Sequence, residues 1–466
     1  MNEKKKPILG QEAVTDARTL GTPRMLILGL QHLFAMFGAT VLVPILVQGY
    51  GLPLSIQTTL LFAGIGTLLF HVCTKFKVPA FLGSSFAFLG GFQAVAGLNT
   101  GKFAAMTGEE KLPYALGGVV IAGLLYLVLA LLFKLVGAKK VMRFFPPIVT
   151  GPIIICIGLS LAGSAINNCR GNWWVALVAI LVVVVCNIWG KGMFKIIPIL
   201  MGVLISYGVA LILHFCGMTN PDGSAILSFS GVSDAHFLGL PPFQLCKFNL
   251  TAILVMAPIA IASMMEHIGD ICAISATVDQ NFLEDPGLHR TLIGDGLATS
   301  LSALFGGPAN TTYGENTGVL ELSRVHDPRV IRLAAIFAVI LGFIPKVAEV
   351  IRSMPFAIIG GISFILYGMI SAIGVRNVVE NHVDFTKSRN LIIAAVIMVC
   401  GLGFAKGLTF TIGGTTITLT GLALAAIFGI LLNAILPGND YAFGENTKGD
   451  VSRGLGMNPQ NSDIEA

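Results

Sequence analysis

The chain has 466 residues, of which 55% are hydrophobic and only 11% are charged, and its mean hydropathy is +0.83. A soluble protein of ordinary composition carries about 25% charged residues, so the composition excludes a typical soluble domain. The formal net charge of +5 does not indicate a nucleic-acid partner, because most basic residues lie at the ends of apolar segments, as membrane topology requires.

Long segments without charge predict a polytopic, all-α membrane protein. No Asp, Glu, Lys or Arg occurs in 25–74, 112–133, 144–169, 171–190 or 353–375. A spanning helix needs about 20 apolar residues, which these segments supply. After a polar, basic lead at 1–24, the first half is predicted to hold seven spans, at 25–48, 55–73, 80–97, 113–136, 145–163, 173–190 and 196–215.

The second half repeats this arrangement. A polar connection at 216–248, which we place outside the cell, leads to an eighth span that starts near residue 250 and continues into 266–270. Six further spans are predicted. The tenth is the polar stretch 308–318, and the others lie at 291–306, 330–345, 355–374, 389–405 and 416–436. The polar tail at 438–466 is predicted to be disordered. The total is fourteen transmembrane segments.

Basic residues and cysteines add two constraints. With fourteen spans, most Lys and Arg residues fall on the side of the N-terminus, so the positive-inside rule places both termini in the cytoplasm. The eight cysteines are scattered without a CxxC pair, so the sequence predicts no disulfide framework, no metal site and no cofactor.

Three pairs of motifs relate the two halves. Gln31-His32 matches Glu266-His267, Ser84–Ala87 matches Thr311–Gly314, and Pro146-x4-Gly151 matches Pro355-x4-Gly360. Each half holds seven spans, an odd number, so the two repeats must insert with opposite orientation. Inverted repeats with broken helices at matching positions predict a binding site near the membrane midplane.

The breaks themselves identify that site. Residues 308–318 are polar and contain the acid Glu315, yet apolar sequence lies on both sides, and 83–88 interrupts the third span in the same way. Irregular backbone at membrane depth is tolerated only where it is buried in protein or lines a cavity. We therefore expect short extended segments in spans three and ten, each followed by a half-helix with free N–H groups, as in a secondary transporter.

The polar groups predict the kind of ligand. Glu266 is the acid within a long apolar span, and we expect it to face the same cavity as Glu315. Two carboxylates and backbone N–H donors suit a small planar ring that carries both N–H donors and C=O acceptors. Phe86 and Tyr313 are expected to contact such a ring.

Four motifs carry a resemblance to a known family. Gln31–Thr40, Gly83–Phe88, Glu266–Gly269 and Asn310–Asn316 resemble the nucleobase–ascorbate transporter family, and within it the bacterial uracil permeases, over nearly the whole chain. The resemblance implies a 7+7 inverted repeat, with a core domain that moves against a gate domain and a homodimer formed through the gate. The implied division is 1–24 lead, 25–137 core (spans one to four), 138–215 gate (spans five to seven), 216–248 external loop, 249–347 core (spans eight to eleven), 348–437 gate (spans twelve to fourteen) and 438–466 cytoplasmic tail.

The resemblance also implies residue roles. Glu266 and Glu315 would hydrogen-bond the uracil ring, and the backbone around Phe86 and Gly314 would meet its carbonyl groups. The side chains implied to line the pocket are Ala39, Tyr313 and Tyr367. Glu at position 315, where related purine carriers usually have Gln, favours uracil over xanthine.

Two positions depart from the family pattern. Asp270 stands where well-characterised uracil permeases have a histidine linked to proton coupling, and Ser323 replaces a usual Thr. Two roles remain open for Asp270: a proton relay together with Glu266, or a structural partner to the first span, for example to His32. We interpret His267 as a packing or hydrogen-bonding residue rather than a ligand.

Three classes of function remain after this reading. The leading prediction is a proton-coupled uracil importer in the bacterial inner membrane, in contact with lipid, with the proton as coupling ion. Xanthine or another nucleobase, or an anion carried by the same architecture, are alternatives, although an anion site should carry a basic residue at the breaks. A membrane-embedded enzyme is disfavoured because HExxH, GxSxG and Walker motifs do not occur.

Overall fold

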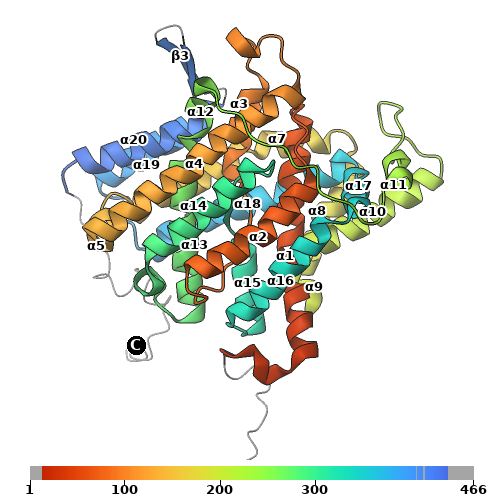
Figure 1. Cartoon of the computed structure of the whole chain (residues 1–466), viewed down its shortest axis with the longest axis horizontal. Coiled ribbons are helices and arrows are strands. Elements are labelled where there is room, and N and C mark those ends of the chain that lie inside the picture. Colours follow the sequence, from red (N-terminus) through yellow and green to blue (C-terminus); the bar gives the residue numbers. More distant parts are fainter. Residues whose placement is uncertain (1–12, 406, 413–414, 439–466) are drawn as a thin grey trace, which may run out of the picture.

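The computed structural model of the chain describes residues 13–405, 407–412 and 415–438. These residues are mostly helical, and Figure 1 shows the helices crossing one another in a single bundle. The tail predicted from residue 438 onward and the first half of the predicted lead lie outside the described residues, apart from residue 438 itself.

The first half of the chain contains one broken span among continuous helices. It begins with η1 (Ala17–Leu20), α1 (Thr22–Gly49) and α2 (Ile56–Cys73). The third apolar segment then divides into β1 (Leu82–Ser84), η2 (Phe86–Phe88) and α3 (Leu89–Ala96). The remaining elements are η3 (Gly101–Phe103), α4 (Gly108–Val136), α5 (Ala138–Met142), α6 (Pro147–Ser160), α7 (Ala162–Cys169), α8 (Trp173–Ile188), α9 (Met193–Ile196), α10 (Pro198–Phe215) and α11 (Ser230–Asp234).

The second half repeats the break at the matching place. It contains α12 (Leu250–Met256), α13 (Ile259–Val278), η4 (Leu283–Gly287) and α14 (Leu288–Leu304). The tenth segment is divided into β2 (Asn310–Thr312) and α15 (Gly314–Ser323). The last elements are α16 (Pro328–Gly342), α17 (Pro345–Arg352), α18 (Phe356–Glu380), α19 (Ser388–Gly403), β3 (Leu408–Ile412), β4 (Thr415–Leu419) and α20 (Gly421–Ile435).

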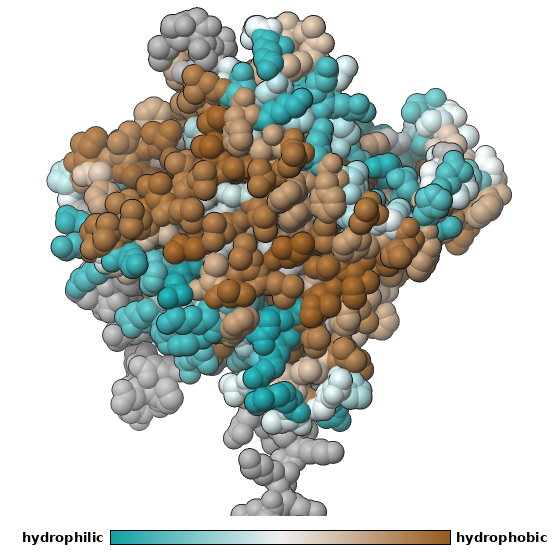
Figure 2. All heavy atoms as spheres, viewed as in Figure 1, coloured by the Kyte–Doolittle hydropathy of each residue, from teal (hydrophilic) through white to brown (hydrophobic). Residues whose placement is uncertain are grey.

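Within the described residues, seven helices are long and apolar enough to cross a membrane, and the number is eight if the bent pair α16–α17 counts as one span. Four shorter apolar helices accompany them, at Phe86–Ala96, Trp173–Ile188, Ser388–Gly403 and Gly421–Ile435. Large apolar side chains such as Leu135, Ile212 and Val399 are more than half exposed. Figure 2 shows the resulting apolar band between hydrophilic ends, which is the surface that lipid requires.

One predicted boundary is wrong. The fourteenth span was expected to begin at residue 416, but the chain there forms the strand β4, which pairs in antiparallel fashion with β3, and α20 begins only at Gly421. Alternating Thr and Ile residues favour a strand over a helix at this position. The hairpin lies at the top of the molecule in Figure 1, at the end opposite the start of α1.

Small residues let the central helices approach closely, as is usual in membrane bundles. In α4 and α14, a Cβ added to Gly123 would lie 2.6 Å from the carbonyl oxygen of Gly296, and the reverse distance is also 2.6 Å. In α6 and α18, a Cβ added to Gly374 would lie 2.7 Å from the carbonyl oxygen of Gly151. These two crossings hold the helices on either side of the broken segments.

Candidate functional site

The site is built on two short strands that meet inside the bundle. β1 and β2 are antiparallel, with Leu82 opposite Thr312 and Ser84 opposite Asn310. The ladder continues beyond them, since Ser85 N–H donates to Ala309 O at 2.9 Å. The predicted extended segments in spans three and ten are therefore present, and their pairing satisfies backbone groups that lipid could not satisfy.

Each strand turns directly into a helix whose first N–H groups are left open. Tyr313, the residue before α15, has extended backbone angles and makes no side-chain cap, and Ser85, before η2, likewise makes none. The first N–H groups of a helix have no partner within the helix, and they give its start a partial positive charge. Glu315 lies in the first turn of α15, where this charge stabilises a carboxylate.

A small cavity of about 30 Å³ lies between these helix starts and the facing helices. It is lined by Phe86, Ile154, Glu266, Asp270, Thr311, Thr312, Tyr313, Gly314, Glu315, Ile370 and Ile373. The structure thus brings together six of the residues expected at the site from the sequence. A water molecule needs about 10–15 Å³ of such volume, so an aromatic ring requires the surrounding helices to separate further.

The other two expected pocket residues lie outside this lining. Ala39 is fully buried in α1. The Tyr367 ring, from α18, meets the Phe86 ring edge to face, with the ring centroids 5.9 Å apart. Tyr367 therefore reaches the cavity only through Phe86 in this conformation.

Glu266 provides an unengaged acceptor at the centre of the site. It lies on α13, which faces both half-helices, and its side chain is partly open to the cavity. Among the described residues, none hydrogen-bonds its Oε2 atom, although this atom is shielded from solvent. A buried acceptor without a partner costs free energy, so this oxygen is suited to a ligand donor.

Asp270 contacts β2 and not the first span. It lies one turn after Glu266 and accepts a hydrogen bond from the Thr312 hydroxyl at 3.2 Å. The suggested partner His32 is engaged elsewhere, because the Asn316 amide lies 3.2 Å from His32 Nδ1 and donates to the His32 carbonyl oxygen at 3.0 Å. The structural role considered for Asp270 with His32 is therefore wrong.

His267 contacts a buried carboxyl group that the sequence analysis missed. Its Nδ1 atom lies 2.9 Å from Asp295 on α14, and both side chains are fully buried. The Thr312 hydroxyl lies 3.4 Å from the same nitrogen, so Asp270, Thr312, His267 and Asp295 form one polar chain. The available signal was that Asp295 is the one acid within the predicted ninth span, 291–306.

Tyr313 joins the two strands. Its hydroxyl donates to the Ser84 carbonyl oxygen at 2.8 Å, so this end of the side chain points away from the cavity. Its ring covers Gly83, where an added Cβ would lie 2.4 Å from two ring carbons. Position 83 must therefore be glycine if the Tyr313 ring is to pack directly against the β1 backbone.

A cavity of about 230 Å³, lined by Phe34, Lys195, Gly314 and Glu315 among others, adjoins the site. Two further cavities flank it. One, of about 180 Å³, is lined by Asp270 and Gly314 and reaches Thr277 and Asn381 at the ends of α13 and α18. The other, of about 540 Å³, is lined by Phe86 and reaches Asn99 and the β3–β4 hairpin. The site thus lies between two openings toward opposite ends of the molecule. No three His, Cys, Asp or Glu side chains in the described part of the chain are placed to hold a metal ion.

Comparisons with known proteins show which family the chain is similar to. The profile of the Permease family matches residues 23–410. The chain is 40% identical to the uracil permease of Bacillus caldolyticus over 466 residues, covering 96% of this chain and 100% of that protein. It is 40% identical to the uracil permease of Bacillus subtilis (strain 168), covering 88% of this chain and 91% of that protein. The uracil permease of Escherichia coli (strain K12) is 38% identical, with 88% and 90% covered.

Solved structures share the fold at low sequence identity. The transmembrane domain of the cyanobacterial bicarbonate transporter BicA aligns with a TM-score of 0.62 and 16% identity, over 85% of this chain and 99% of that one. SLC26A9 aligns with a TM-score of 0.63 and 13% identity, over 88% of this chain and 64% of that one. At these identities the likeness concerns the architecture of a membrane transporter only.

Proposed function

The chain belongs to the Permease family, and from this premise we propose that it carries uracil across the membrane together with protons. The observation that carries the proposal is the placement of Glu266 and Glu315 around one cavity at the start of an uncapped half-helix. The names of relatives about 40% identical over most of the chain point to the same substrate.

The polar groups match the hydrogen-bonding edge of a uracil ring. Uracil presents N–H donors and C=O acceptors in one plane, and carboxylates accept while helix-start N–H groups donate. The unengaged Oε2 of Glu266 supplies one acceptor, Glu315 supplies another, and the N–H groups near Phe86 and Gly314 face the carbonyl oxygens. Phe86 packs against the ring face.

Proton coupling follows from the charges of the cavity. Glu266, Asp270 and Glu315 line one small space, and none of its lining residues is Lys or Arg. Like charges this close in a low-dielectric environment repel strongly, so a proton bound among them stabilises the loaded site. We assign this role to Glu266 and Asp270. The same set of charges disfavours an anion as the substrate.

The wider architecture proposed is a 7+7 inverted repeat of fourteen membrane segments. The antiparallel pairing of β1 with β2 supports opposite insertion of the two halves. The segments are α1, α2, β1–α3, α4, α6–α7, α8, α10, α12–α13, α14, β2–α15, α16, α18, α19 and α20. Core and gate domains with the boundaries given above, and a dimer formed through the gate, complete the proposal, in a bacterial inner membrane with both termini in the cytoplasm.

The decisive test is uptake of radiolabelled uracil by cells that lack their own carrier. Wild-type protein and Glu266→Gln are compared with and without a protonophore, and uptake of radiolabelled xanthine is measured in parallel. We expect saturable uptake that collapses with the protonophore and is lost in Glu266→Gln. Glu109→Gln, which changes an exposed acid in the first turn of α4, is the matched control and should transport normally.

Each other outcome assigns a different function. Uptake of xanthine but not of uracil would make the chain a purine carrier and overturn the role of Glu315. Uracil uptake that is equal with and without the protonophore would contradict proton coupling but not uracil transport. No uptake of any base, by protein shown to reach the membrane, would favour the anion carrier.

A further inference from the structure

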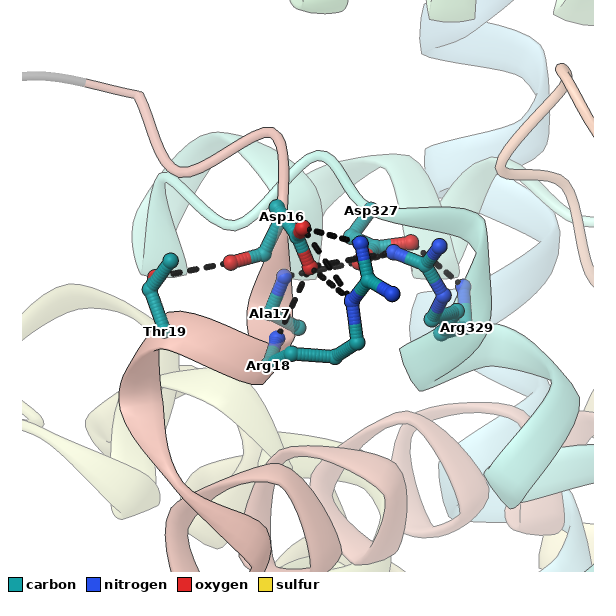
Figure 3. Close-up of polar contacts among 6 residues, drawn as sticks. All are labelled: Asp16, Ala17, Arg18, Thr19, Asp327 and Arg329. Atoms are coloured by element: carbon teal, nitrogen blue, oxygen red, sulfur yellow. Dashed lines mark hydrogen bonds and ion pairs between the residues drawn. The ribbon is translucent and has the colours of Figure 1, made fainter.

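The segment before α1 is attached to the link between α15 and α16, more than three hundred residues later in the chain (Figure 3). Val14 forms a parallel bridge with Val325, in which Val14 N–H donates to Arg324 O at 2.8 Å and His326 N–H donates to Val14 O at 2.9 Å. The backbone of the lead is thus hydrogen-bonded to the residues that follow α15, the half-helix that carries Glu315.

Asp327 is the central polar group of this attachment. One of its carboxylate oxygens accepts from Arg329 N–H at 2.9 Å and caps the start of α16. The other accepts from Ala17 N–H at 2.7 Å and from the Arg329 guanidinium at 2.9 Å. The same guanidinium reaches Asp16 at 3.0 Å, so it joins both segments. Asp327 is almost fully buried, which makes these bonds costly to lose.

Apolar side chains seal the contact. A separate small core, away from the main core of the bundle, is formed by Val14, Ala17, Leu28, Val325 and Val330. Leu20 and Met25 pack against it. The attachment therefore combines backbone pairing, a buried charge network and an apolar cluster, and we call residues 14–18 with 324–330 the N-terminal clamp.

The clamp lies at the opposite end of α15 from the candidate site. Glu315 is in the first turn of this helix, and Arg324, in left-handed conformation, ends it. At a rise of about 1.5 Å per residue, the ten-residue helix is about 15 Å long. Near its start, Asn316 donates to the His32 carbonyl of α1. The helix is therefore tied to α1 or its lead at both ends.

We propose that the N-terminal clamp fixes the position of α15 for substrate binding, with Asp16 and Asp327 as positioning residues that act on uracil through Glu315. The clamp joins α1, α15 and α16, which belong to the proposed core domain, so it stays closed while the core moves. The choice of uracil as the substrate rests on the proposed function. The attachment of residues 14–18 to residues 324–330 does not depend on what the protein transports.

Substitutions at the clamp should change the KM for uracil and leave the maximal rate per surface molecule nearly unchanged. For Asp16→Ala and Asp327→Ala we expect KM to rise about 2- to 30-fold, the range by which residues along a contact network alter affinity. Asp327→Asn keeps a good cap for α16 but loses its charge, so a raised KM in this variant is not due to fraying of α16. Arg24→Ala is the matched control, because Arg24 is an exposed arginine in the first turn of α1 and lies outside the clamp.

Covalent closure supplies the second measurement. In a Val14→Cys/Val325→Cys variant treated with a short thiol cross-linker, uptake should persist with an unchanged KM, and wild type treated alike controls for the native cysteines. Adding Asp327→Ala to this variant should raise KM before cross-linking and restore it afterwards. Loss of uptake on cross-linking, or no recovery of KM, would overturn the proposal.

Limited digestion with trypsin tests the N-terminal clamp independently of the proposed function. Cleavage after Arg324 and Arg329 should be faster in Asp327→Ala than in wild type, whatever the protein transports. If the wild-type protein resists cleavage at these sites but takes up no uracil, the proposed function is wrong and the attachment of the N-terminal segment is still supported. Equal cleavage of the variant and wild type would overturn the clamp.

Discussion

His267 Nδ1 lies 2.9 Å from a carboxylate oxygen of Asp295, and neither side chain has any exposed surface. The pair joins α13, which carries Glu266, to α14, which packs against α4. Through the Thr312 hydroxyl it also reaches Asp270. The core of the bundle is therefore connected by polar contacts to the cavity that Asp270 and Glu266 line.

Breaking this pair should destabilise the protein and impair transport. Removing one partner of a buried polar pair leaves the other group without compensation, which typically costs about 1–3 kcal/mol and more where the group is charged. We expect Asp295→Asn and His267→Leu each to lower the melting temperature in detergent and to reduce uracil uptake. The double variant should be more stable than the sum of the two single changes predicts.

The control for that experiment is Asp279→Asn. Asp279 lies just after α13 on the surface, and its left-handed conformation is one that Asn also adopts readily. Its melting temperature and uptake should match wild type. Additive effects of Asp295→Asn and His267→Leu would show that the two side chains act independently.

Gly83→Ala should be among the most damaging single substitutions in the chain. The new methyl group would lie 2.4 Å from the Tyr313 ring and 2.7 Å from the Thr40 hydroxyl, so the ring or the strand must move. Overpacking of this kind costs about 1–3 kcal/mol. Gly90→Ala, on α3, has no neighbour within 4 Å and serves as control. Thermal unfolding and uptake that match between the two variants would contradict the close contact.

The breaks in the two spans could be predicted from the sequence for a local reason. Thr311, Thr312 and Tyr313 favour extended backbone, and an acid follows them in otherwise apolar sequence. The structure confirms a strand and then a helix at this place. The cavity around Glu266 and Glu315 follows from the same logic, since membrane-buried polar groups must face protein.

Features that depend on distant partners could not be predicted in this way. Nothing in the sequence near His267 indicates Asp295, because their contact requires the packing of α13 against α14. The lead was treated as a plain polar segment, yet Ala17 is bonded to Asp327. By contrast, the strand at 415–419 carried a local signal, Thr-Ile alternation after Gly413-Gly414, which typically marks a hairpin but was outweighed by its apolar content.

The contribution of Asp16 to the clamp should not depend on pH in the physiological range. Hydrogen bonds from Arg18 lower the pKa of Asp16, which lies outside the membrane, from 3.8 to about 2. Because this pKa is depressed, the stabilisation is complete above about pH 4 and is lost only as the pH falls toward 2. The ratio of the uracil KM of Asp16→Ala to that of wild type should therefore stay constant from about pH 5 to pH 8. A ratio that falls steadily across this range would show that Asp16 titrates there.

Gly314→Ala tests whether the open start of α15 is a ligand surface. An added Cβ would meet only Ile373 at 3.6 Å and Asp270 at 3.8 Å, which are ordinary contacts, so the fold accommodates alanine. The methyl group would nevertheless project beside the cavity that Gly314 lines. Alanine is also the better helix former by about 0.5–1 kcal/mol, so the variant should melt no lower than wild type. Uracil binding should weaken markedly while stability is kept.

Gly318→Ala is the matched variant for Gly314→Ala. Gly318 lies one turn later on the same helix, has no neighbour within 4 Å and is absent from the lining of the small cavity. It lines two of the larger cavities beside the site together with Gly314, but not the small cavity that holds Glu266. It gains the same helical preference, so uracil binding, measured by ligand-induced thermal shift, should be weakened less than in Gly314→Ala. If both variants bind uracil normally, the start of α15 is not where the ring lies. If both lose binding, the effect comes from the helix as a whole and not from the position of Gly314.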